Sequence, residues 1–335
     1  MHLASTLKTF RIVMVNGILI AVSLLAGLAG PGSATSAAGA RASRALGVGQ
    51  PLFRSSVEAV AVSVTVHDRG GRVITTLTRG DFSVFEDGAP REVRDFYPGE
   101  SAVSLAVLLD ISGSMAVGGN MERAREAVSQ AISHLQSTRD EAALFTFDTE
   151  LLEVHAFTSD LQQIAALDLA GRPWGQTSLF DAIDLTARRA SERASHHRAV
   201  LVITDGVDTG SRLTAAQVSG AASAIDVPVY LVVVANPVDN PARRLAVTAG
   251  GVAAEAATLA DLARWTGGDM AIVSERAEVS AALQALMEEL RHQYLITFEP
   301  SSQPGWHPIE IRTGKKDLSV RARSGYFTGP ARPEP

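Results

Sequence analysis

The sequence predicts an α/β fold in which a doubly wound, mostly parallel sheet carries a small β-sandwich module. The first indication is a continuous apolar run at 103–109, typical of a strand that is buried on both faces. The second is the alternation of such runs with segments of helical spacing as far as residue 290, which is the pattern of a parallel sheet covered by helices. The third is β character both before and after this stretch, so we expect the two flanking segments to form one sandwich around an inserted α/β domain.

These observations divide the 335 residues into consecutive segments. In chain order we expect a leader with the start of a linker at 1–44, the rest of the linker at 45–56, a β segment at 57–99, the α/β domain at 100–291, a C-terminal β segment at 292–328 that packs with the first, and a tail at 329–335. At roughly 150 residues per domain, this length is consistent with about two domains.

The leader differs in composition from the rest of the chain. Lys8 and Arg11 precede an apolar run at 18–29, and small residues follow from 30 to 42. A positively charged N-terminal region, a short apolar segment and a following stretch of small residues are typical of a secretory signal peptide. Because a membrane-spanning helix needs about 20 apolar residues, a cleaved signal is favoured over a retained N-terminal anchor. Either segment predicts an exported protein, located in the periplasm, in the cell envelope or outside the cell.

Charge and cysteine content exclude several classes of function. The formal net charge is −6, and it becomes −10 without residues 1–44, which carry four basic residues and no acidic one. An acidic exported protein is a poor candidate for binding nucleic acid, and we expect membrane contact only through an N-terminal anchor. The chain has no cysteine, which excludes disulfides, thiolate nucleophiles and cysteine-ligated zinc.

The two β segments consist of apolar runs separated by turn residues. Before the α/β domain we expect no helix, but strands at 57–66 and 73–77 and a hairpin that joins 82–86 to 91–96 around Asp87-Gly88. After the α/β domain we expect strands at 294–298, 307–312 and 318–323.

In the α/β domain, strands and helices alternate. We expect strands at 103–109, 142–147, 199–204, 227–234 and 270–273. Helical spacing predicts helices at 121–135, 179–190, 215–224, 259–265 and 279–290.

Polar residues whose side chains can bind a metal ion follow the first of these strands. Asp110, Ser112 and Ser114 alternate along one short loop, in which Gly113 allows a tight bend. In an open α/β sheet, ligands bind at the carboxyl ends of the strands. A carboxylate and two hydroxyls are hard oxygen ligands, which suit Mg²⁺, Mn²⁺ or Ca²⁺ better than zinc.

Two further oxygen donors stand at equivalent strand ends. Asp205 follows the strand at 199–204, and Thr177 stands in a loop just before a helix. Together with Asp110, Ser112 and Ser114, they resemble the metal-ion-dependent adhesion site of the von Willebrand factor A domain, over about Ser101 to Leu290. The resemblance implies that these five residues hold a divalent ion, Mg²⁺ in the first place, some directly and some through water. It also implies that one coordination position stays open to water or to a partner's carboxylate.

The flanking segments resemble a narrower group. The stretches 77–88, 294–298 and 320–327 are similar to bacterial, often acidobacterial, exported VWFA-related proteins, which extends the resemblance to Val57–Phe327. That group has no assigned activity, so the resemblance informs the architecture more than the function.

Several other residues allow both a functional and a plain structural interpretation. Asp148 could support the metal ligands or cap the end of a strand, and Asp181 could orient the Thr177 loop or cap backbone amides. Trp174 could contact a partner at the rim of the site or anchor its loop by packing.

Two motifs are interpreted as structural. Arg79-Gly80-Asp81 has the sequence of an integrin-binding tripeptide, but we interpret it as a turn. His196-His197 is not expected to bind zinc, because adjacent side chains point apart and no third ligand follows at suitable spacing.

These features predict an exported, adhesion-like or assembly-like protein-binding module that captures a Glu or Asp of a protein partner through Mg²⁺. We expect no enzymatic activity, because the chain has no nucleophile elbow, no His-Glu-x-x-His helix and no phosphate-binding loop. Two alternatives stay open at this point: a metal-assisted hydrolase, and a structural envelope component whose metal only stabilises the loops.

Overall fold

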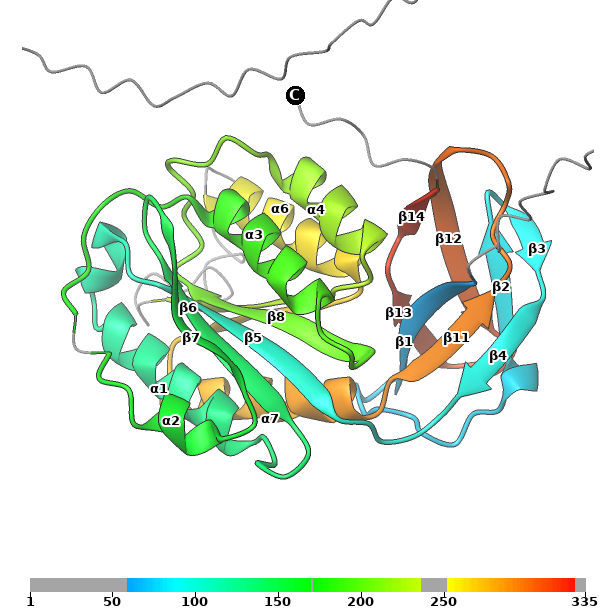
Figure 1. The fold of residues 1–335 in the computed structure, drawn as a ribbon, viewed down its shortest axis with the longest axis horizontal. Helices are drawn as coiled ribbons and strands as arrows, with labels where there is room; N and C mark the ends of the chain where they lie inside the picture. The colour runs from blue at the N-terminus through cyan, green and yellow to red at the C-terminus, as the bar shows by residue number, and fades with distance from the viewer. Residues whose placement is uncertain (1–58, 170, 236–251, 329–335) are drawn as a thin grey trace, which may run out of the picture. The chain divides into compact units, whose positions relative to one another are not determined.

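The computed structural model describes residues 59–169, 171–235 and 252–328 (Figure 1). The expected leader, linker and tail lie outside these residues. None of the described helices is long and apolar enough to cross a membrane.

The sandwich is built from both flanking segments, as the sequence predicts. One sheet has the strand order β13-β1-β11-β4 and the other the order β14-β12-β2-β3. The N-terminal segment supplies β1 (Val60–Asp68), β2 (Phe82–Glu86), β3 (Ala89–Arg91) and β4 (Val93–Tyr97). The C-terminal segment supplies β11 (Tyr294–Phe298), β12 (Gly305–Thr313), β13 (Leu318–Ala322) and β14 (Gly325–Thr328).

Strands that are far apart in sequence pair within each sheet. β1 runs antiparallel to β11, with Val60 opposite Phe298, and β2 runs antiparallel to β12, with Val84 opposite Ile311. Inward side chains of both sheets form one buried core. An aromatic group inside it joins Phe82, Phe96 and Tyr294, whose rings lie 5.2–5.6 Å apart. The N- and C-terminal segments therefore fold as one unit.

Three details of the sandwich differ from the expectations. The strand expected at 73–77 is only an isolated bridge between Val73 and His67. The hydroxyl of Tyr294 replaces a neighbouring strand there: it accepts from the amide of Leu77 at 3.0 Å and donates to the carbonyl of Ile74 at 2.7 Å. The strand expected at 91–96 breaks at Glu92, where the chain crosses from one sheet to the other. The last strand, β14, was not expected.

The Arg79-Gly80-Asp81 motif forms a short 3-10 helix, not an open turn. The Asp81 carboxylate accepts hydrogen bonds from the amide and the hydroxyl of Thr78, at 2.7 and 2.9 Å. The carboxylate is thus used in a local cap, which agrees with the structural interpretation of this motif.

The α/β domain contains a six-stranded sheet of the order β10-β9-β8-β5-β6-β7, in which β7 is antiparallel to its neighbour and the others are parallel. The strands are β5 (Val103–Asp110), β6 (Glu141–Phe147), β7 (Leu151–Thr158), β8 (His197–Thr204), β9 (Val229–Val234) and β10 (Met270–Val273). The helices are α1 (Asn120–Ser133), α2 (Leu161–Ala165), α3 (Leu179–Ser191), α4 (Ala215–Ala224), α6 (Val252–Thr266) and α7 (Arg276–Arg291).

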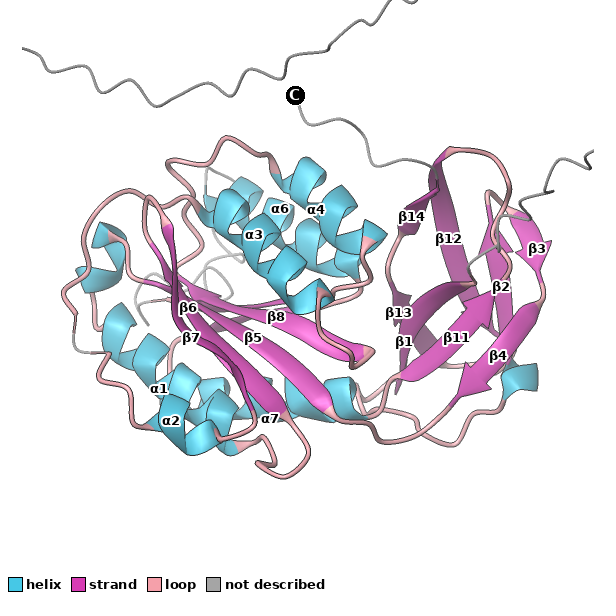
Figure 2. Cartoon of the chain, viewed as in Figure 1, coloured by secondary structure: helices cyan, strands magenta, loops and turns pink. Residues whose placement is uncertain are grey.

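Helices cover both faces of this sheet, as Figure 2 shows. Alternate β5 side chains face opposite cores: Leu105 and Val107 pack with α1, α2 and α7, whereas Ala106 and Leu108 pack with α3, α4 and α6. This double burial explains the continuous apolar run of β5. The sheet is doubly wound, as expected. The edge strand β7 and the short helix α2 were not expected, and β7 has no fully buried residue.

Acidic residues at the amino ends of the strands are paired with arginines. The Asp140 carboxylate accepts from Arg291 at 2.7 Å, and Arg321 donates to Asp269 and Glu289. Buried Arg323 forms an ion pair with Asp226 at 3.4 Å and donates to the carbonyl groups of α4 and β1. Arg321 lies in β13, and Arg323 lies between β13 and β14. Because their acidic partners belong to the α/β domain, these pairs connect the two modules.

Candidate metal centre

The expected metal ligands come together where the strand order of the sheet reverses. β5 ends at Asp110, and its neighbour β8 ends at Thr204, directly before Asp205. The register pairs Leu109 with Ile203, so the two aspartates leave adjacent strands at the same edge. From β5 the chain proceeds to β6 on one side, and β8, β9 and β10 follow on the other. Ligands bind at such a switch point because the loops diverge there.

Asp110 is completely buried, with an exposed fraction of 0%. Its Oδ1 accepts the backbone amide of Ser112 at 2.8 Å, and its Oδ2 accepts the hydroxyl of Thr204 at 2.6 Å. The carboxylate is therefore fixed in orientation by its own loop and by the neighbouring strand.

The two serines and Asp205 extend the cluster. The hydroxyl oxygens of Ser112 and Ser114 lie 3.1 Å apart, and the side chain of Ser114 lies close enough to Asp205 to lower the pKa of its carboxyl, against the larger effect of burial. A 3-10 turn, Gly113–Ala116, holds Ser114 in place, and its Met115 is fully buried beneath. The structure thus brings Asp110, Ser112, Ser114 and Asp205 into one polar group.

The group carries excess negative charge. Burial raises the pKa of Asp110 to about 6, although hydrogen bonds from Ser112 and Thr204 oppose the shift, and the charge of Asp205 raises it further. Burial also raises the pKa of Asp205. Within the described residues, neither aspartate forms an ion pair with Lys, Arg or His. Two carboxylates and neighbouring hydroxyls without a compensating cation fit a divalent ion with a preference for oxygen ligands.

Thr177 lies on a third loop beside the cluster. This loop is joined to the Asp110 loop by hydrogen bonds from Gly113 to the carbonyl of Gly175 at 3.1 Å and from Trp174 to the carbonyl of Ile111 at 3.0 Å. Thr177 itself is buried, yet in the described structure no hydrogen bond joins its hydroxyl to the other four residues. The structure therefore places Thr177 beside the group, but its hydroxyl forms no hydrogen bond with the other four residues.

Asp148 and Asp181 both bond to backbone. The carboxylate of Asp181 accepts the amides of Arg212 and Leu213 at 2.9–3.2 Å, which is the capping role considered for it. The carboxylate of Asp148 accepts the amide of Glu150 at 3.1 Å, and its carbonyl accepts the amide of Ser178 at 2.8 Å. Both residues hold the loops around Thr177.

Sequence reasoning missed several supporting residues. Thr204 orients Asp110, and it was counted only as the end of a strand. Asp208 accepts the amide of Leu179 at 2.8 Å, and Ser211 accepts that of Phe180 at 2.9 Å, so both cap the start of α3. The available signal was a loop rich in Asp, Thr and Ser after Asp205, residue types that favour helix caps.

Other candidate ligands are not available. His197 is buried and His196 is exposed, so the pair points apart, as expected. In the sandwich, Glu86, Asp87 and His307 form a group with metal-binding side chains. His307 Nδ1 is bonded to Asp87 at 2.7 Å and its Nε2 to the carbonyl of Gln303 at 2.8 Å, while Glu86 is paired with Arg91. This second group is therefore saturated with internal contacts.

A match to a known protein family agrees with this fold. Residues 105–207, which include all five expected ligands, match the family of the von Willebrand factor type A domain. No curated protein matches the sequence.

Several solved structures are similar at low sequence identity. The conserved hypothetical protein BatB from Bacteroides thetaiotaomicron is 19% identical, with a TM-score of 0.44, and the match covers 56% of this chain and 98% of that one. A von Willebrand factor type A protein from Catenulispora acidiphila is 12% identical, with a TM-score of 0.43 and coverage of 82% and 75%. Proximal thread matrix protein 1 of the mussel byssus, with a zinc-occupied MIDAS motif, is 14% identical, with a TM-score of 0.45 and coverage of 61% and 48%.

Proposed function

We propose that this chain is a divalent-metal-dependent protein-binding module. In this proposal Asp110, Ser112, Ser114, Thr177 and Asp205 hold Mg²⁺, with Mn²⁺ or Ca²⁺ as alternatives, and a Glu or Asp of a protein partner completes the coordination. The observation that carries the proposal is the pair of carboxylates, Asp110 and Asp205, at neighbouring strand ends without a compensating cation among the described residues.

The proposed ligands contribute to binding the ion in different ways. Asp110, fixed by Ser112 and Thr204, supplies a buried negative charge, and Asp205 supplies a second, less buried one. The hydroxyls add neutral ligands, so the donor set balances two positive charges without exceeding them. When bound, the ion would supply an electrophilic position for an incoming carboxylate.

The surrounding acids support a binding role over a catalytic one. A metal-assisted hydrolase needs a general base close to the ion. Asp148, Asp181 and Asp208 are the nearby candidates, and each already accepts backbone amides. We therefore propose that the module binds without turnover.

The proposal includes export, and it rests for this on the sequence of the leader. Lys8, Arg11 and the apolar run at 18–29 have the order of a secretory signal. Outside the cell or in its envelope, Mg²⁺ and Ca²⁺ are available to a site of hard oxygen ligands.

Isothermal titration of the metal-free protein with Mg²⁺, Mn²⁺, Ca²⁺ and Zn²⁺ tests the site. Zn²⁺ is included because it occupies the MIDAS motif of the mussel protein. We expect one bound ion in the wild type and a loss of binding in Asp110→Asn, because the substitution removes a buried charge and preserves the shape. Asp317→Asn, which removes an exposed carboxylate of the sandwich, is the matched control and should bind the ion as the wild type does.

Equal uptake of metal by the wild type and Asp110→Asn would contradict the proposed site. A metal-dependent hydrolase activity that disappears in Asp110→Asn would contradict the binding role and favour the enzymatic alternative. Metal that raises the melting temperature but changes no interaction with an acidic ligand would favour the structural alternative.

A further inference from the structure

Each of the three loops that form the candidate site also exposes a large apolar side chain. Val117 stands three residues after Ser114, Trp174 three residues before Thr177, and Val207 two residues after Asp205. Their exposed fractions are 66%, 82% and 36%, and Trp174 is the most exposed large apolar residue of the described structure. The ligands and the apolar side chains therefore occur on the same three loops.

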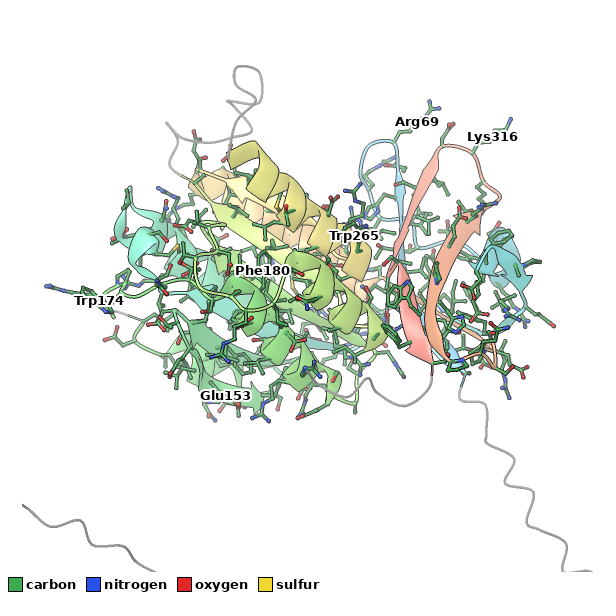
Figure 3. All side chains as sticks on the ribbon, turned by 90° about the horizontal axis from the view of Figure 1, so that it is seen from above. Arg69, Glu153, Trp174, Phe180, Trp265 and Lys316 are labelled. Carbon is green, nitrogen blue, oxygen red and sulfur yellow. The ribbon has the colours of Figure 1, made fainter. Side chains whose placement is uncertain are left out.

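The backbone beneath Trp174 is fixed while its side chain is free. The amide of Trp174 donates to the carbonyl of Ile111, and the next carbonyl, that of Gly175, accepts from Gly113. A side chain on Gly175, which has a φ of +89°, would come within 3.2 Å of the Asp148 carboxylate, so this position requires glycine. Figure 3 shows Trp174 at the outer edge of the α/β domain, pointing away from it.

This arrangement is that of a preorganised contact. An exposed tryptophan on a fixed backbone loses little conformational freedom when a partner covers it, and tryptophan is enriched among the residues that dominate binding energy. Val117 and Val207 are joined to the ligand loops by hydrogen bonds from their amides, to the carbonyl of Ser114 and to the carboxylate of Asp205. The exposed apolar side chains are thus carried by the same loops that carry the ligands.

We infer that the partner presents its carboxylate together with a large apolar or aromatic side chain, which packs on Trp174 and Val117 while the carboxylate reaches the ion. This inference rests on the proposed function and narrows it from any exposed Glu or Asp to an acidic residue beside an apolar one. The acidic half of the motif follows from the proposed function, in which a carboxylate of the partner completes the coordination of the ion. The apolar half follows from the exposed fractions of Trp174 and Val117.

Short synthetic peptides test the inference directly. One blocked peptide carries a single Glu among Gly and Ser, a second carries the same Glu with Phe beside it, and a third carries the Phe with Gln in place of Glu. In Mg²⁺ we expect the wild type to bind the Glu–Phe peptide about tenfold more tightly than the Glu-only peptide, which is the size of effect expected when two aromatic rings pack together. The Gln–Phe peptide should not bind, and chelation with EDTA should abolish the binding of the other two.

Variants separate this inference from the proposed function. Trp174→Ala should lower the affinity for the Glu–Phe peptide to that for the Glu-only peptide, while its Mg²⁺ affinity, measured by titration, stays unchanged. Leu185→Ala is the matched control, since Leu185 is also exposed but lies on α3, away from the three loops. Asp110→Asn should lose both metal and peptide.

The outcomes are distinguishable. Equal affinity of the wild type for the Glu–Phe and Glu-only peptides, or an undiminished preference in Trp174→Ala, would overturn the inference and leave the metal site intact. Failure of the wild type to bind metal would overturn the proposed function itself. Sedimentation experiments can also detect Mg²⁺-dependent self-association. If the wild type self-associates in this way and Trp174→Ala does not, the exposed apolar side chains bind a second copy of this chain, and the inference of a different partner protein is overturned.

Discussion

The two ends of the six-stranded sheet treat buried negative charge in opposite ways. At the amino ends of β6 and β9, a buried aspartate before the strand is paired with an arginine: Asp140 with Arg291 and Asp226 with Arg323. Before β10, Arg321 pairs with the exposed Asp269. At the carboxyl ends of β5 and β8, Asp110 and Asp205 lie close together, and among the described residues neither has such a partner. Charge is therefore balanced internally at one end and left for a ligand at the other.

The two environments differ in what their hydrogen bonds leave free. Asp140 accepts the amides of Val103 and Gln136 as well as Arg291, so one of its three donors carries a positive charge. Asp110 accepts one amide and one hydroxyl, both neutral, and burial raises its pKa to about 6. A buried carboxylate without a countercharge is costly unless a ligand compensates it, so such a residue indicates function more strongly than a buried ion pair does.

Removing one charge from the balanced end should have the largest effect. In Arg323→Met the side chain keeps much of its length, but Asp226 loses its ion pair and the carbonyls of Ser223 and Ala61 lose a donor. We expect the free energy of unfolding to fall by about 3–5 kcal/mol, as for other buried pairs with one partner removed. Urea denaturation of the metal-free protein measures it.

An exposed pair of the same chemistry is the control for this prediction. Arg69 and Asp317 form an ion pair with both side chains more than half exposed, and Figure 3 labels Arg69 at the surface. Arg69→Met should cost less than about 1 kcal/mol. If the two variants are destabilised equally, the contrast between the two ends does not reflect buried charge.

Binding of Mg²⁺ at the carboxyl ends of β5 and β8 should stabilise the protein by a smaller amount than Arg323→Met destabilises it. At a Mg²⁺ concentration of about 100 times the dissociation constant, we expect the free energy of unfolding of the wild type to rise by about 2.7 kcal/mol. Asp110→Asn should show no such rise, and without metal it should be at least as stable as the wild type, because it no longer buries an uncompensated charge. Thermal unfolding with Mg²⁺ and with EDTA measures both effects; a metal-free Asp110→Asn that is clearly destabilised would contradict the charge argument.

Local and periodic signals predicted most of the fold. The helix at 215–224 has the expected bounds, and β5 was recognised because burial on both faces leaves a continuous apolar run. The segment 73–77 was misjudged because its backbone is held by the hydroxyl of Tyr294, more than 200 residues away along the chain. β7 was missed because an edge strand that is only partly buried has a weak alternation of apolar and polar residues.

The same distinction between local signals and distant contacts applies to the candidate site. Asp110, Ser112 and Ser114 were found because their spacing is local, and Asp205 because it directly follows a recognisable strand. Thr204 could not be assigned its role, because its contact with Asp110 spans 94 residues and depends on the pairing of β5 with β8. Distant pairings of this kind are properties of the fold, so the sequence alone predicts the ligands better than the residues that orient them.

The amino end of the sheet also contains a buried group that is stable only when neutral. Burial lowers the pKa of His197, at the start of β8, to about 4, although the nearby backbone of Leu290 opposes the shift. Because the unfolded chain keeps a pKa of about 6.5, it binds more protons than the native protein between these two values. This contribution to stability is complete above the unfolded value, is lost as the pH falls toward 4, and does not change further below that.

Between pH 7 and pH 5 we expect His197 to reduce the free energy of unfolding by about 1–2 kcal/mol, the smallest of the three effects. His197→Phe should remove this part of the pH dependence, whereas His196→Gln, at the exposed neighbouring position, should retain it. Urea denaturation at a series of pH values measures the difference between the variants. Identical pH profiles for the wild type and His197→Phe would mean that His197 accepts a proton in the native state, and the amino end would then tolerate an unpaired positive charge as the carboxyl end tolerates unpaired negative ones.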